Sequence, residues 1–482
     1  MDLLYTIITQ MKKTFYITTT LPYVNAEPHI GFALEIVAAD VIARHQRLLG
    51  NAVVFNTGTD EHGQKIFQKA EENGQNTQEY TDFWAEKFSD LKELLALEYT
   101  HFIRTTNPHH KAAAQEFWNR CQENGDIYKK LYKTLYCVGC ELEKQASELE
   151  NGYCPLHPGK ELESREEENY FFKFSKYQQQ LLNLYETNTE FVKPAGKLKE
   201  ITAFVSGGLQ DFSISRLKEK MSWGVGVPGD DKHVMYVWFD ALVNYISTLG
   251  WPEDTQNFET YWPGIQLAGK DNLRQQAAMW QAMLISAGLP HTSQILINGF
   301  ISVNGQKMSK SLGNVIAPTD MVDRYGTDAT RFLLMNLGPF GTDMDVTWEK
   351  FDTTYTAFLS NGLGNLCSRV AKLCEKSEAH FTSEAQENSI EYQNHLNAYE
   401  ILPALEYTFA LVTTTDQYLS ETTPWKKTGT QQQEILQKAV TDILQIAVYL
   451  TPFMPKTAQT IQEHFSKQQI TALEPLFPRL TK

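Results

Sequence analysis

Long hydrophobic runs are missing from this sequence. No stretch approaches the roughly 18 consecutive apolar residues that a transmembrane helix needs. The first residues, MDLLYTIITQMKK, also lack the basic start and the small-residue cleavage site of a secretory signal peptide. A second methionine, Met11, makes residues 1–10 an expected extension outside the fold. We therefore expect a cytoplasmic protein that does not contact a membrane.

Cysteine is scarce as well, with 6 residues in a chain of 482. This number is too low for a disulfide scaffold, and three of the six lie close together. A CxxC turn and a CxxH turn, separated by 13 residues, have the spacing of a tetrahedral zinc knuckle. Four protein ligands leave no position for water, so one structural Zn²⁺ is expected rather than free core cysteines. The expected ligands are Cys137, Cys140, Cys154 and His157.

Basic residues are fewer than acidic ones. The chain has 43 Lys and Arg and 58 Asp and Glu, which gives a net charge of −15. Such a chain does not grip nucleic acid indiscriminately, since that kind of binding neutralises phosphates with many cations. Local basic strips for one RNA remain compatible with this charge. The length and the 42% of hydrophobic residues suffice for a large core divided into several domains.

Hydrophobic periodicity divides the chain into regions. Strand-like and helix-like segments alternate before residue 128 and again after residue 234, which predicts a parallel α/β sheet. Between them, short strands, the cysteine cluster and acidic runs indicate an inserted domain. The last third has helical spacing with one apolar stripe, which predicts a helix bundle. The expected boundaries are 1–10 for the extension, 11–127 and 235–347 for the α/β halves, 128–234 for the insert, and 348–482 for the bundle.

Two short motifs carry the chemistry. HIGF, which begins at His29, follows a predicted strand and places an imidazole and a small glycine, Gly31, at a helix N-terminus, where a triphosphate is favoured. KMSKS, far later in the chain, offers Lys307 and Lys310 on a loop that can clamp phosphates as charge develops. The alternative for this pair is a capped helix and a solvated basic loop.

Together the two motifs resemble the paired signatures of class I aminoacyl-tRNA synthetases. Their surroundings resemble the methionyl-tRNA synthetase family, because TTTLPYVNAEPHIG, NTGTDEHG, VWFDALVNY, GKDNLR, NGQKMSKSLGN and GNLCSR occur in this order. The resemblance implies a Rossmann-like catalytic domain with an inserted zinc-knuckle connective domain, followed by an all-α anticodon-binding bundle. It also implies that ATP with Mg²⁺ activates L-methionine to methionyl-adenylate plus pyrophosphate. Methionine then passes to the 3′-terminal adenosine of tRNA-Met.

The resemblance assigns roles to individual residues. Asp60 would pair with the methionine ammonium group, and Arg216 would hold Asp60 in place. A stripe at helical spacing from Trp238 would present an apolar wall to the thioether, where the alternative is an ordinary core stripe. The implied methionine-binding set is Leu21, Tyr23, Asp60, Arg216, Trp238, Ala241, Leu242, Tyr245, Asn272, Gln276 and Trp280. The implied ATP-binding set is His29, Gly31, Phe32, Gly269, Asp271, Lys307, Met308, Ser309, Lys310 and Ser311, with His29, Lys307 and Lys310 as catalytic candidates.

Three positions depart from the family pattern. Phe32 stands where the family usually has the final histidine of its motif, and the loss of one such contact costs about 10²- to 10³-fold in rate if nothing compensates. Asn272 and Gln276, expected on one helical face, replace an aliphatic residue and a histidine. The floor of the methionine pocket is therefore expected to be rebuilt with amides.

The helical domain contains candidates for recognising RNA. GNLCSR places Asn365 and Arg369 one turn apart, and Trp425 follows Pro424. An amide, a guanidinium and an indole can read unpaired bases by edge hydrogen bonds and stacking. The resemblance implies that these three residues contact the CAU anticodon. Taken singly, their alternatives are a helix cap, a surface ion pair and a core indole.

Two rival hypotheses stand beside this one. A related class I synthetase for leucine or cysteine is disfavoured by the missing editing sequence and by the anticodon residues. A catalytically silent tRNA-binding module, suggested by Phe32 and Gln276, is disfavoured by Asp60, Asp271 and the KMSKS loop. No appended tRNA-binding barrel follows the bundle, so we expect a monomer. Packing alone excludes homocysteine only about 10- to 200-fold.

Overall fold

The computed structural model describes residues 13–140, 142–144, 149–308, 313–382 and 389–480. The chain forms two compact units, each built from segments that are separated in sequence. Unit 1 comprises Met1–Glu27, Ala52–Asp90 and Tyr99–Ile297, and unit 2 comprises Pro28–Asn51, Leu91–Glu98 and Asn298–Lys482. Within the described residues, no helix combines the length and the apolarity needed to cross a bilayer.

The centre of unit 1 is a parallel sheet of six strands, as the alternating pattern predicts. Its central strands contain apolar runs such as AVVF and QILIN and are largely buried, which is typical of parallel sheets covered by helices. The order is β3 (His101–Arg104), β2 (Ala52–Thr59), β1 (Thr14–Thr18), β12 (Ile265–Gly269), β13 (Gln294–Asn298) and β7 (Val192–Lys193). The later strands therefore rejoin the first ones, as expected, and the edge strand β7 comes from the range predicted as the insert.

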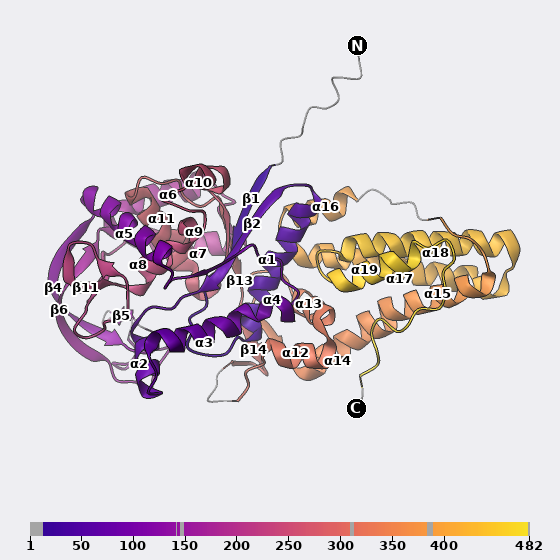
Figure 1. Ribbon diagram of the computed structural model, residues 1–482, viewed down its shortest axis with the longest axis horizontal. Helices are drawn as coiled ribbons and strands as arrows, with labels where there is room; N and C mark the ends of the chain where they lie inside the picture. Colours follow the sequence, from indigo (N-terminus) through magenta and orange to yellow (C-terminus); the bar gives the residue numbers. More distant parts are fainter. Residues whose placement is uncertain (1–12, 141, 145–148, 309–312, 383–388, 481–482) are drawn as a thin grey trace, which may run out of the picture. The chain divides into compact units, whose positions relative to one another are not determined.

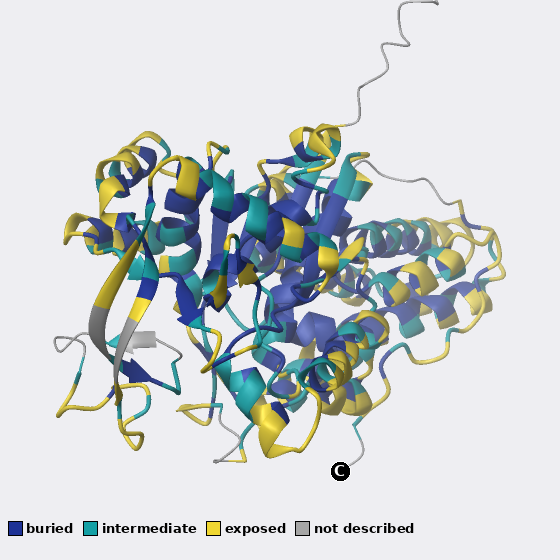
Figure 2. Ribbon diagram, turned by 60° about the vertical axis from the view of Figure 1, so that its left-hand side comes forward, coloured by how far each residue is buried: buried dark blue, intermediate teal, exposed yellow. Residues whose placement is uncertain are grey.

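Helices of unit 1 share one core with this sheet. Phe117 on α5 packs against Trp280 on α11 and against Phe239, and all three side chains are buried. Figure 2 shows buried residues along the strands and exposed residues on the outer helix faces. The helices are α2 (Gln64–Glu72), α3 (Thr77–Ser89), α5 (Pro108–Glu123), α6 (Gln178–Thr187), α7 (Ala195–Ser206), α8 (Val237–Ala241), α9 (Asn244–Ser247), α10 (Thr255–Tyr261) and α11 (Trp280–Ser286).

The inserted segment of unit 1 is antiparallel. Its long ribbon pairs β4 (Ile127–Cys137) with β6 (Glu163–Phe172), from Ile127 opposite Phe172 to Tyr136 opposite Glu163 (Figure 1). The strands β5 (Leu142–Lys144) and β8 (Phe212–Ser213) flank this ribbon. A second small sheet joins β10 (Gly226–Val227), β11 (Asp230–Met235) and β9 (Ser215–Leu217). Since β4 ends at Cys137, the ribbon carries the cysteine cluster at one end.

Unit 2 is mainly helical, and its C-terminal part is the predicted bundle (Figure 1). Along α18 the buried side chains recur every three or four residues, as in Leu436, Val440, Ile443 and Ala447. The helices are α1 (Ile30–Leu48), α4 (Leu91–Leu94), α12 (Pro318–Tyr325), α13 (Thr327–Met335), α14 (Trp348–Thr354), the π-helix η6 (Tyr355–Gly364), α15 (Asn365–Ser377), α16 (Ile390–Asn397), α17 (Ile401–Thr422), the 3₁₀ turn η7 (Pro424–Lys426), α18 (Gly429–Leu450) and α19 (Pro455–Phe465). A small sheet orders β15 (Gln306–Lys307), β14 (Ile301–Val303) and β16 (Met344–Val346).

One buried guanidinium joins α1 to the bundle inside unit 2. Arg331 on α13 is fully buried and pairs with Asp40 on α1 at 2.8 Å. Its N–H groups also donate to the carbonyls of Leu95, Pro452 and Phe453 at 2.8 to 3.0 Å. A buried charge is tolerated only when it is paired and hydrogen-bonded in this way. The helix that opens with HIGF is thus fixed against the turn between α18 and α19.

Candidate active site and metal centre

The loop after β2 brings two of the predicted methionine-binding residues together in unit 1. Asp60 and Tyr23 form a parallel β-bridge, which continues the pairing of β2 with β1. The N–H of Asp60 donates to Pro22 O at 3.0 Å, and the N–H of Val24 donates to Asp60 O at 3.2 Å. The side chain of Asp60 is mostly buried at the carboxyl end of a central strand, where ligands of open α/β sheets bind.

The next residue, Glu61, anchors this loop and was not singled out from the sequence. Its buried carboxylate accepts hydrogen bonds from the hydroxyls of Thr59 and Thr106 at 2.6 and 2.5 Å. Arg104 donates to both carboxylate oxygens, at 2.6 and 2.9 Å. The indole N–H of Trp223 donates to the carbonyl of Glu61. The sequence signal that could have revealed this anchor is the row of ionisable residues in NTGTDEHG, at the end of a buried strand.

The predicted wall of the pocket is formed by two short helices instead of one. Trp238 and Ala241 lie on α8, Leu242 lies in the following turn, and Tyr245 lies on α9. Ala241, Leu242 and Tyr245 are buried and Trp238 is half-buried. The ring of Tyr245 lies 5.9 Å from that of Trp280, whereas the ring of Trp238 lies 5.6 Å from that of Tyr236, so the wall formed by the whole stripe stays a prediction.

The segment around Gln276 differs from the regular helix that was expected. A 3₁₀ turn covers Lys270–Asn272 (η3), and a π-helical turn covers Gln275–Met279 (η4). The helical type therefore differs from a regular α-helix, because a π turn is wider than an α turn, and the expectation that Asn272 and Gln276 share one helical face stays a prediction. Gln276 donates to the Tyr245 hydroxyl at 2.7 Å. Its amide oxygen and the Trp280 indole N–H, both buried, have no hydrogen-bond partner among the described residues.

The predicted ribose contacts follow the carboxyl end of β12, next to β1 in the sheet. Gly269 ends this strand and is half-buried, and Asp271 is exposed in the turn that follows. Leu21, half-buried, follows β1 in the same way. Three predicted contacts thus lie beyond neighbouring strand ends, which is where nucleotides bind in such sheets.

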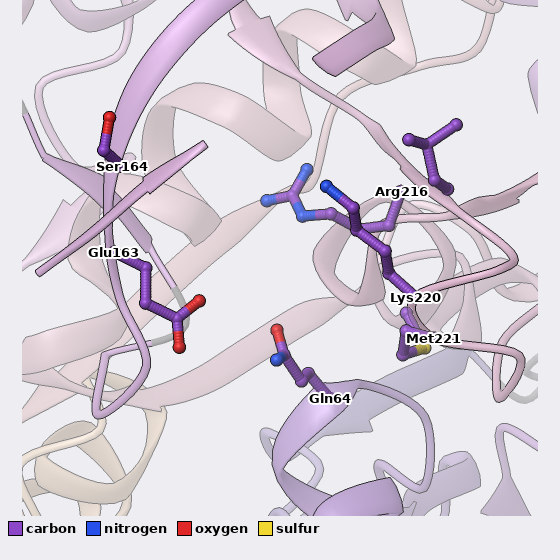
Figure 3. Close-up of a pocket in the computed structure, with 7 residues that line it drawn as sticks. Gln64, Glu163, Ser164, Arg216, Lys220 and Met221 are labelled. Atoms are coloured by element: carbon purple, nitrogen blue, oxygen red, sulfur yellow. The ribbon is translucent and has the colours of Figure 1, made fainter. Parts of the chain in front are cut away.

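Arg216 lines a cavity of about 460 Å³ in unit 1 (Figure 3). Its guanidinium donates to the Ser213 hydroxyl at 3.0 Å and to the Ser215 carbonyl at 2.7 Å, and it lies over the Tyr236 ring. The expected contact of Arg216 with Asp60 stays a prediction. The cavity combines two cations with one carboxylate, and its lining residues are Gln64, Glu163, Ser164, Arg216, Leu217, Lys220 and Met221.

The start of HIGF lies near Met308, a described residue of KMSKS, inside unit 2. His29 caps α1, because its Nδ1 accepts a hydrogen bond from the N–H of Gly31 at 3.0 Å. A neutral imidazole that accepts at Nδ1 carries its hydrogen on Nε2. A Cβ atom on Gly31 would lie 2.8 Å from the His29 ring and 3.7 Å from the methyl carbon of Met308. The N–H of Ile30 donates to Ile316 O at 3.1 Å, which ties the start of α1 to the segment after KMSKS.

The remaining residues of the two motifs are described in part. Phe32 lies half-buried in the first turn of α1. Lys307 ends β15 and is exposed, with its ammonium group 5.4 Å from the centre of the Phe300 ring. Ser309, Lys310 and Ser311 lie outside the described residues.

The four predicted metal ligands form one cluster at the end of the β4–β6 ribbon. Their ligand atoms all lie within 4.8 Å of one another. The Cys140 sulfur is 3.3 Å from the Cys154 sulfur and 3.2 Å from His157 Nδ1. Nδ1 of His157 is also 3.8 Å from the sulfur of Cys137 and 3.9 Å from that of Cys154. A set of three soft sulfurs and one imidazole with these separations fits a tetrahedral metal ion such as Zn²⁺.

The turn between the first two cysteines is shaped around the histidine. A Cβ atom on Gly139 would lie 2.5 Å from the His157 ring, closer than real Cβ contacts allow. The ring therefore packs directly onto backbone, and Nδ1 faces the sulfurs. With all four ligands supplied by the protein, the site suits a structural ion and leaves no open position for catalysis.

The predicted anticodon residues lie on the helical part of unit 2. Asn365 and Arg369 fall one turn apart on α15, and Asn365 is exposed. Arg369 forms an ion pair with Asp416 at 2.8 Å and is 29% exposed. Trp425 on η7 is 47% exposed, which is unusual for an indole and leaves a stacking plane accessible.

Family models match nearly the whole chain. The model of tRNA synthetases class I (M) matches residues 15–156 and 139–371. The model of the anticodon binding domain of methionyl tRNA ligase matches residues 371–476.

Individual relatives give the same picture. A methionine–tRNA ligase of Nostoc sp. is 41% identical, over 95% of this chain and 91% of that protein. The methionine–tRNA ligase of Synechocystis sp. is 40% identical, over 93% of this chain and 89% of its own length. Among solved structures, Mycobacterium tuberculosis methionyl-tRNA synthetase in complex with methionyl-adenylate superposes with a TM-score of 0.89 at 33% identity, covering 97% of this chain and 98% of that one.

Proposed function

The chain belongs to the methionyl-tRNA synthetase family of class I aminoacyl-tRNA synthetases, and from this premise we propose how its residues carry out the ligase reaction. The reaction joins L-methionine to tRNA-Met at the expense of ATP. The rival hypotheses of a leucine or cysteine synthetase and of a silent tRNA-binding module have no support among these relatives, which are methionine–tRNA ligases.

Methionine binds in unit 1 beside the loop after β2. The carboxylate of Asp60 pairs with the ammonium group of the substrate, and Trp238, Tyr245 and Trp280 surround the thioether. The buried amide of Gln276 donates to the Tyr245 hydroxyl and so orients it within this wall. Sulfur against aromatic rings is a favourable contact, which supports this choice of side chains.

ATP, with Mg²⁺, would be held by residues of the HIGF and KMSKS motifs. The carboxylate of methionine attacks the α-phosphate, and pyrophosphate leaves. His29, through the hydrogen on Nε2, and the lysines Lys307 and Lys310 stabilise the charge that develops on the phosphates. Asp271 and Gly269 bind the ribose. The protein acts by positioning and charge stabilisation, without a covalent enzyme intermediate.

In the second step a hydroxyl of the terminal tRNA adenosine attacks the carbonyl of the adenylate, which releases AMP. Asn365, Arg369 and Trp425 contact the CAU anticodon. The exposure of Asn365 and of the Trp425 ring supports this role, because unpaired bases need accessible edges and planes.

The observation that carries the proposal is the pairing of Asp60 with Tyr23 beside a buried aromatic wall. The test is ATP–pyrophosphate exchange by the purified protein with methionine, leucine, cysteine and homocysteine. We expect exchange that strongly favours methionine. We also propose that the protein is a cytoplasmic monomer, so light scattering should give the mass of one chain, 55.1 kDa. Equal exchange with leucine, or none with any amino acid, would contradict the proposal.

The Cys137, Cys140, Cys154 and His157 cluster holds one structural Zn²⁺, which supplies folding energy to a lobe with little core of its own. Replacing Cys140 by serine should lower the zinc content from about one ion per chain to near none and expose the β4–β6 ribbon to proteolysis. Cys374→Ser, at a buried cysteine on α15, is the matched control and should keep its zinc. Elemental analysis of both proteins measures the difference, and equal metal content in the two would refute the assignment.

A further inference from the structure

Three buried titratable side chains meet beside the methionine pocket in unit 1. The carboxylate of Asp240 has Nδ1 of His62 at 3.2 Å from Oδ2 and 3.4 Å from Oδ1. On the other side, Nε2 of His110 lies 3.7 Å from Oδ1. All three residues are at most 1% exposed. None of them belongs to the methionine, ATP, metal or anticodon sets assigned above.

The cluster is arranged to keep Asp240 ionised away from water. Burial opposes ionisation of this carboxyl, but the two histidines outweigh it, and the pKa of Asp240 lies below its usual value. Burial lowers the pKa of His110, which favours the neutral form of this ring. Its Nδ1 lies 3.0 Å from the Ser247 hydroxyl, and its Nε2, at 3.7 Å from Asp240, is beyond hydrogen-bond distance. His62, the nearer histidine, donates to Asp240 through Nδ1.

The three residues come from three different elements around the pocket. His62 follows Asp60 by two positions, in the loop after β2. Asp240 lies on α8 between two residues of the thioether wall, Trp238 and Ala241. His110 lies on α5, the helix whose Phe117 stacks on Trp280 at 5.4 Å. The contact between His62 and Asp240 therefore links the loop that carries Asp60 to α8, the helix that carries Trp238 and Ala241.

We propose that His62 and Asp240 are positioning residues, which set the carboxylate of Asp60 at the distance from the α8 wall that methionine requires. This inference rests on the proposed function of Asp60. The two ends of the substrate are held by different elements, so a change in their separation weakens binding even when both ends are intact. A misplacement of about 1 Å costs up to about 10²-fold in such sites.

The test compares two substitutions of His62. Asparagine keeps an N–H donor near the position of Nδ1, whereas leucine fills similar space without a donor. In ATP–pyrophosphate exchange, His62→Leu should raise the KM for methionine about 10- to 100-fold with little change in the KM for ATP. His62→Asn should recover most of this loss. Asp240→Asn should resemble His62→Leu, and the double variant should be no worse than either single one.

Asp126→Asn separates positioning from a general loss of stability. Asp126 is a buried carboxylate of the same unit, but it accepts hydrogen bonds from Asn124, Lys176, Tyr177 and Ser286 and not from the cluster. The Asp126→Asn variant should have a lower melting temperature and an unchanged KM for methionine. If the His62 variants raise both KM values together, or only lower the folded fraction, the inference is wrong. Wild-type exchange tests the proposed function separately, because its absence refutes that function before any variant is compared.

Discussion

His29→Asn should lower kcat for ATP–pyrophosphate exchange about 10²- to 10³-fold while leaving the melting temperature close to that of the wild type. In the structure the Nδ1 of this ring caps α1, and in the proposed mechanism its Nε2 offers a hydrogen to phosphate. Asparagine at an N-cap accepts the same hydrogen bond, as Asn76 does from Gln78 at the start of α3. It cannot reach the phosphates, so the substitution removes catalysis and keeps the cap.

The control for this prediction is Asn76→Ala, which removes a cap of the same geometry at a helix without a catalytic role. It should destabilise the protein by about 1 kcal/mol and leave exchange unchanged. Steady-state exchange and thermal unfolding of the two variants measure both effects. An active His29→Asn protein would show that His29 only caps the helix.

Asp60→Asn should increase the KM for methionine by a factor between about 30 and several thousand, with a smaller effect on the KM for ATP. The substitution keeps the shape of the side chain but leaves the substrate ammonium group without its counter-charge in a mostly buried site. Removing one partner of such a pair costs about 2 to 5 kcal/mol, and every 1.4 kcal/mol is tenfold in affinity.

Asp254→Asn is the matched control, because it makes the same chemical change at the N-cap of α10, where asparagine caps equally well. Its kinetics should equal those of the wild type. Isothermal titration with methionine in the absence of ATP gives the binding loss directly. A normal methionine affinity in Asp60→Asn would assign the ammonium group to another residue.

The parallel sheet could be predicted from sequence because its strands are apolar on both faces and are separated by helices with a clear apolar stripe. The neighbours Tyr23 and Asp60 follow from the same logic, since adjacent parallel strands end at the same edge. The break between α8 and α9 and the π turn at Gln276 could not be predicted in this way. Buried side chains keep their approximate spacing across such a break, so the periodicity does not reveal it.

The cluster of His62, Asp240 and His110 was also beyond the sequence. His62 and Asp240 stand in different motifs 178 positions apart, and His110 stands in no motif, so nothing in the sequence brings the three together. Only the folded core shows that α5, α8 and the loop after β2 bury their polar groups against one another. The departures at Phe32 and Gln276, in contrast, were visible from the motifs alone, because the neighbouring letters fix their positions.

Gly139 and His157 constrain each other in the evolution of the metal site. A thiolate as the fourth ligand is compact, whereas the imidazole of His157 reaches over the turn and occupies the space of a side chain at position 139. With histidine at 157 in this position, a larger residue at 139 would require the ring or the turn to shift, and cysteine at 157 would release that restriction. The two positions should therefore vary together among relatives, with glycine at 139 wherever histidine stands at 157.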